Sequence, residues 1–64
     1  MRDFIIAEIV GYEQAVEGPE VGESQREHCL LMIAGLTWYL LQVEKLDIWD
    51  VLAMIDVYKK GRVQ

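Results

Sequence analysis

The segment from Cys29 to Val43 constrains the fold most, because it is apolar on nearly every side. Thirteen of its fifteen positions are apolar or glycine, and the two polar ones are Thr37 and Gln42. A helix that is apolar all round has to be buried all round, and a chain of 64 residues has little else with which to bury it. The segment therefore predicts a helix that packs within its own chain and also against a partner, most simply a second copy.

The length of the chain admits one domain, which we place at residues 1–64. Folds of this size usually gain stability from disulfides, a metal or oligomerisation. Cys29 is the only cysteine and His28 the only histidine, so we expect neither an internal disulfide nor a zinc site. We expect no cofactor, a cytoplasmic location in which a lone thiol stays reduced, and stabilisation by oligomerisation.

Hydrophobic spacing divides the chain into three expected helices. The connection between the second and the third is short, so we expect those two to form an antiparallel hairpin. The fold class that follows is all-α, assembled as a homodimeric helical bundle. The expected helices span about residues 4–16, 25–45 and 48–60.

Residues at the expected helix ends support these boundaries. Ser24 and Glu27 have the spacing of a capping box at the start of the second helix. Asp47 is suited to cap the third helix. Gly18 and Gly61 are placed to end the first and the third helix.

The first segment is the least certain of the three. Ile5, Ile9, Tyr12 and Val16 follow one another at spacings of four, three and four, which is one helical face. Residues 3–10 are also rich in β-branched side chains, which favour a strand. A strand would have no pairing partner in this chain unless it paired with a second copy, so we expect a helix.

The second helix carries two apolar seams on different sides. Cys29, Ile33, Leu36, Leu40 and Val43 form one, and a second begins at Leu31. One seam can meet the other helices of the chain, and the other needs a second molecule. Gly35 lies in the middle of this helix. Glycine at such a position costs about 1 kcal/mol relative to alanine, and a close crossing by another backbone would explain its presence. The expected self-interface consists of Leu31, Ala34, Gly35, Leu36, Trp38 and Leu41.

The net charge of −5 lies entirely in the first part of the chain. Residues 1–27 hold seven acidic and two basic side chains, whereas residues 28–64 hold four of each. Such a field repels nucleic acid and anionic membranes and attracts a basic surface. We therefore expect no direct nucleic-acid binding and, besides a second copy, an unidentified protein partner with a basic surface. The expected partner-binding residues are Glu13, Glu17, Glu20, Glu23, Trp49 and Asp50.

No catalytic, metal-binding or nucleotide-binding motif stands out, and we do not expect an enzyme. His28 and Cys29 are adjacent and would point about 100° apart on a helix, which prevents a nucleophile–base pair. The apolar segment of fifteen residues is shorter than the roughly 17–25 that a membrane span needs. Aspartates at the start of the third helix argue against a helix-turn-helix that reads DNA.

We expect a small acidic regulator or inhibitor that forms a homodimer and acts by binding another protein. One alternative is an inhibitor of the phage type, which would mimic nucleic acid and bind a host protein that recognises DNA or RNA. Two more are a subunit of a larger assembly, whose open seam meets a different chain, and a small membrane-associated protein.

Overall fold

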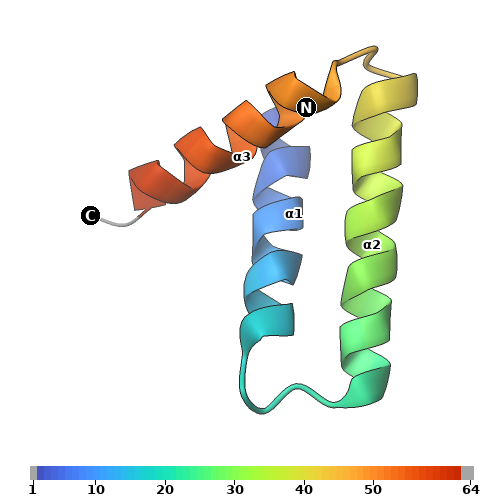
Figure 1. Cartoon of the computed structure of the whole chain (residues 1–64), viewed down its shortest axis with the longest axis vertical. Helices are drawn as coiled ribbons and strands as arrows, with labels where there is room; N and C mark the ends of the chain where they lie inside the picture. The colour runs from blue at the N-terminus through green and yellow to red at the C-terminus, as the bar shows by residue number, and fades with distance from the viewer. Residues whose placement is uncertain (1, 63–64) are drawn as a thin grey trace.

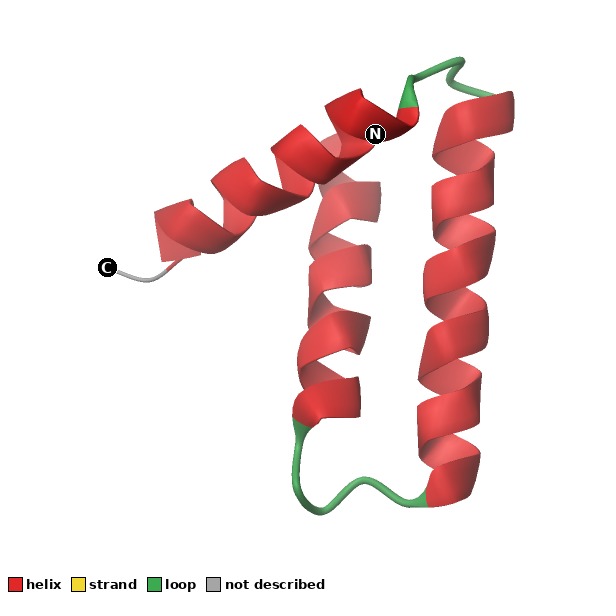
Figure 2. Cartoon of the chain, in the orientation of Figure 1, coloured by secondary structure: helices red, strands yellow, loops and turns green. Residues whose placement is uncertain are grey.

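Three helices account for most of the chain. The structure is a computed structural model that describes residues 2–62, and the side chains of residues 2–61. Its helices are α1 (Arg2–Glu17), α2 (Glu23–Gln42) and α3 (Ile48–Arg62). No strand occurs among the described residues (Figure 2). The expected all-helical fold is confirmed, and residues 4–10 are helical rather than extended.

The antiparallel pair in this fold is formed by α1 and α2. The two helices lie side by side and run in opposite directions (Figure 1). α3 crosses the N-terminal half of α1, packs mainly against it, and projects away from α2 (Figure 1). The expected antiparallel hairpin of the second and third helices is therefore not confirmed.

The linker between α2 and α3 explains this arrangement. Lys45 has a φ of 60°, in the left-handed region that often ends a helix with a sharp turn. The Leu46 N–H donates to the carbonyl oxygen of Leu40 at 3.0 Å, which closes the chain around the end of α2. The Leu46 side chain packs against the buried core. The linker is thus an ordered turn that directs α3 across α1 instead of back along α2.

The start of α2 differs from the expected capping box. Gly22 is the N-cap, and Ser24 lies inside the first turn. The Gly22 N–H donates to Oε1 of Gln25 at 3.4 Å, so Gln25 has the role that the spacing predicted for Glu27. The cap lies two residues earlier because Gly22, in extended conformation, already ends the loop.

The other helix ends follow the sequence more closely. Asp47 caps α3, since its Oδ1 accepts the N–H of Trp49 at 3.3 Å. α1 ends at Glu17, directly before Gly18. At the far end, α3 continues through Gly61 to Arg62, so Gly61 does not terminate it.

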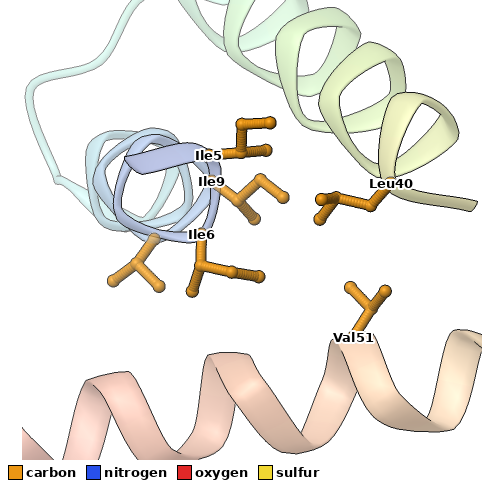
Figure 3. Close-up of a cluster of buried hydrophobic side chains, with 6 residues drawn as sticks. Ile5, Ile6, Ile9, Leu40 and Val51 are labelled. Atoms are coloured by element: carbon orange, nitrogen blue, oxygen red, sulfur yellow. The ribbon is translucent and has the colours of Figure 1, made fainter. Parts of the chain in front are cut away.

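α1 lies at the centre of the core, between α2 and α3. Ile5 and Ile9 point toward Leu40 of α2, whereas Ile6 points toward α3 (Figure 3). α2 has only Cys29 and Leu40 buried among its described residues. Much of its apolar surface is therefore left without cover from its own chain. The buried side chains of the described region are Ile5, Ile6, Ile9, Val10, Cys29, Leu40 and Val51.

Candidate interaction surfaces

The outward side of α2 carries an uncovered apolar stripe, which we call the α2 seam and define as Leu31, Ala34, Gly35 and Trp38. All four residues are exposed, with Leu31 at 72% and Trp38 at 60%. Spacings of three, one and three place them together on one face of a helix. The buried Cys29 lies on the other side of α2, beside Gly11 and Tyr12 of α1. These are four of the six residues expected in a self-interface.

Gly35 has no packing or conformational role among the described residues. A Cβ added at this position would meet nothing within 4 Å, and no glycine among the described residues has a positive φ. Neither packing nor backbone conformation therefore requires glycine here. It nevertheless costs about 1 kcal/mol relative to alanine in the interior of a helix.

Leu36 and Leu41 complete the expected self-interface set, but they lie elsewhere. Both are only partly exposed and pack against the buried cluster. Leu36 lies four residues before the fully buried Leu40, on the side of α2 that faces α1. The structure thus uses these two leucines in its own core, and the seam is narrower than the sequence indicates.

A second apolar surface lies on α3, and we call it the α3 face: Trp49, Leu52, Ala53 and Val57. Trp49 is 73% exposed and Val57 68% exposed, and Leu52 and Ala53 are also exposed. Asp50 is exposed beside Trp49. Leu52 is exposed because the oblique crossing of α3 over α1 leaves it outside the contact.

Phe4 is an exposed aromatic residue that the apolar spacing of the first helix does not reveal. It is 66% exposed and lies next to the buried Ile5. The only signal in the sequence is its position, one residue before the apolar face of the first helix.

The acidic residues of the loop region form a third surface. Glu17, Glu20 and Glu23 are exposed around the loop between α1 and α2. This loop lies at the end of the helix pair far from the start of α3 (Figure 1). Trp49 and Asp50 lie at the start of α3, so the expected partner-binding residues do not form one continuous site.

Glu13 differs from the other expected partner-binding acids because it is already paired. Its Oε2 accepts a hydrogen bond from Nζ of Lys59 at 2.9 Å, and both side chains are partly exposed. The hydrogen bond and the charge of Glu13 raise the pKa of Lys59 above its usual value, with smaller contributions from Glu17 and Asp56. Glu13 thus joins α1 to α3 instead of presenting a free charge.

The neighbourhood of Cys29 is a shallow depression between α1 and α2. The thiol is free and buried, while His28 is exposed and lies edge-on to the ring of Tyr12, with 6.3 Å between ring centroids. Ala15 and Val21 line the same depression. Among the described residues, no group of three or more His, Cys, Asp or Glu side chains could hold a metal ion.

The length and polarity of the helices decide whether any of them could cross a membrane. Within the part of the chain that the structure describes, no helix is both long and apolar enough to cross a bilayer.

Comparison with known proteins adds no family to this description. No protein-family model, curated protein or solved structure matches the chain.

Proposed function

We propose that this chain is a non-enzymatic helical protein that forms a homodimer and acts by binding another protein. The observation that carries the proposal is the uncovered apolar surface of α2 and α3. Seven large apolar side chains of these two helices are 39–73% exposed: Leu30, Leu31, Trp38, Ile48, Trp49, Leu52 and Val57. Monomeric proteins rarely expose contiguous apolar patches on this scale unless the patch is a binding site.

The accessible surface of the chain agrees with a missing partner. It measures 4827 Å², whereas a compact monomer of 7.4 kDa exposes about 4,200 Å². The excess of roughly 600 Å² approaches the ~800 Å² per partner that a stable interface covers. One additional molecule docked on each chain is enough to account for it.

The two apolar surfaces support two different contacts. The α2 seam is continuous, central and free of charge, which suits a permanent contact between copies. The α3 face has Asp50 beside its tryptophan, and exposed tryptophans are frequent anchors of protein interfaces. We assign the seam to self-association and the α3 face, with the acidic loop, to another protein.

Melting at different protein concentrations tests the homodimer. If folding is coupled to dimerisation, Tm rises with protein concentration, because mass action favours the associated native state. A Tm that stays constant over a hundredfold range of concentration would contradict a dimeric folding unit.

A pull-down from lysate, eluted with increasing salt, tests the binding of another protein. Trp49→Ser should lose a partner that resists salt, because apolar docking is not screened. Replacing Glu17, Glu20 and Glu23 by Gln should lose a partner that salt releases. A captured protein that both variants retain would show that neither surface is the binding site.

A further inference from the structure

The α2 seam is self-complementary when α2 meets a second copy running in the opposite direction. We infer that two copies of α2 cross antiparallel about a two-fold axis level with Ala34 and Gly35. The arrangement rests on the proposed homodimer and adds its register and polarity. A two-fold interface requires residue i of one copy to meet residue j of the other, and j to meet i.

The order of residues along the seam meets that requirement. Counted outward from the midpoint between Ala34 and Gly35, small residues come first, then the large Leu31 and Trp38 at equal distance on either side. Leu31 of each copy therefore lies against Trp38 of the other. The exposed Glu27 and Gln42 follow, again equidistant from the midpoint. A carboxylate facing an amide provides a hydrogen-bonded edge to the apolar centre.

The small residues at the centre allow the two backbones to come close together. Helices approach to 8–10 Å depending on the side chains at the crossing point. Gly35 and Ala34 occupy that point, and the large side chains lie where the two axes diverge. This explains a glycine whose Cβ position is empty within the chain. The accessible surface in excess of a compact monomer is also what one such contact per chain would cover.

Charge selects the antiparallel orientation over the parallel one. Glu23 and Glu27 occupy the N-terminal part of α2, and the exposed Lys45 follows its C-terminal end. The neighbouring Glu44 is already paired with Arg2 at 3.3 Å. Antiparallel pairing brings the acids of each copy near Lys45 of the other, and it also opposes the two helix dipoles. A parallel pair would place Glu27 against Glu27 and Glu23 against Glu23 in a chain that already carries a net charge of −5.

Cross-linking with a short bis-maleimide reads the orientation directly. Glu27→Cys and Gln42→Cys are introduced singly and together. Each variant is made in a Cys29→Ala background and also in the wild-type background, where the native Cys29 thiol is buried. In the antiparallel pair, position 27 lies beside position 42 of the partner. The two copies of position 27 are then about 22 Å apart along the helix axis. The double variant should be converted largely to a covalent dimer, and each single variant should stay monomeric on a denaturing gel.

The other outcomes show whether the antiparallel arrangement, the α2 seam or the homodimer itself is wrong. Covalent dimers of the single Glu27→Cys variant would mean parallel pairing, and would overturn the arrangement while leaving the dimer intact. A wild-type chain that sediments as a dimer, with no cross-link in the double variant, would place the interface elsewhere and overturn the seam. A wild-type chain that sediments as a monomer would overturn the proposed homodimer and the arrangement together.

Discussion

Gly35 is a single residue at which the isolated chain and the dimer predict opposite results. Within the chain, Gly35→Ala meets no neighbour, so it should stabilise the monomer by about 1 kcal/mol through helix propensity. In the dimer, the added Cβ lies at the closest approach of the two helices and should weaken association about tenfold. Denaturant unfolding and sedimentation equilibrium measure the two effects.

Gly11→Ala is the matched control for Gly35→Ala. Gly11 also lies in mid-helix, in α1, and an added Cβ there also meets nothing within 4 Å. It should stabilise the fold by about 1 kcal/mol and leave association unchanged. Equal stabilisation by both variants, with unchanged association, would remove Gly35 from any interface.

The contact between Glu13 and Lys59 predicts a change in the pKa of a lysine. Glu13→Gln should lower the pKa of Lys59 toward its usual value, since the Glu13 hydrogen bond and charge are the main causes of its rise. Because the pKa of Lys59 is raised in the folded state, the pair stabilises the fold below the ordinary lysine pKa. That contribution is lost as the pH rises through the raised value.

An NMR titration of the Lys59 side chain measures this shift. Glu8→Gln is the control, because Glu8 lies on α1 but is not among the groups that shift the pKa of Lys59. Equal Lys59 titration curves in the wild type and Glu13→Gln would contradict the contact.

The turn between α2 and α3 is the element on which the arrangement of the helices depends. Lys45 adopts a φ of 60°, which costs a residue with a Cβ roughly 1 kcal/mol and costs glycine little. Lys45→Gly should therefore raise the free energy of unfolding by up to about 1 kcal/mol, whereas Lys45→Ala should give no such gain. Denaturant unfolding of the two variants distinguishes them, and equal stabilities would contradict the left-handed turn.

The elements themselves could be predicted from local patterns, but their arrangement could not. Three helices follow from the spacing of apolar residues, and the cap at Asp47 follows from its position before an apolar run. The partners of α2 do not follow, because α2 is apolar on several sides and its sequence favours no one of them. The central place of α1 depends on Ile6 and Val10, which lie beside the single face that the sequence indicates.

The candidate surfaces show the same division between local and tertiary information. Leu31, Ala34, Gly35 and Trp38 could be found from their spacing. The spacing also groups Leu36 and Leu41 with them, because a repeat of apolar residues does not reveal which members another helix of the same chain covers. The pairing of Glu13 with Lys59 joins residues 46 positions apart and has no local signal.

In the whole molecule, the small core and the uncovered apolar surface have the same cause, because the chain covers few of its own apolar side chains. The chain buries few side chains around α1 and exposes large ones on α2 and α3. Small domains with so little core usually need added stabilisation. We propose that a second copy on the α2 seam supplies this added stabilisation.

Sedimentation velocity of the wild type, Leu31→Glu and Val57→Glu tests whether a second copy covers the α2 seam. The side chains of Leu31 and Val57 are similarly exposed, at 72% and 68%, but only Leu31 lies on the α2 seam. We expect a wild-type particle of twice the 7.4 kDa chain mass. Val57→Glu should remain dimeric, and Leu31→Glu should dissociate with a Kd raised at least about a hundredfold, because its carboxylate would be buried unpaired. A monomeric wild type, or a Leu31→Glu variant as dimeric as Val57→Glu, would contradict a dimer formed through the α2 seam.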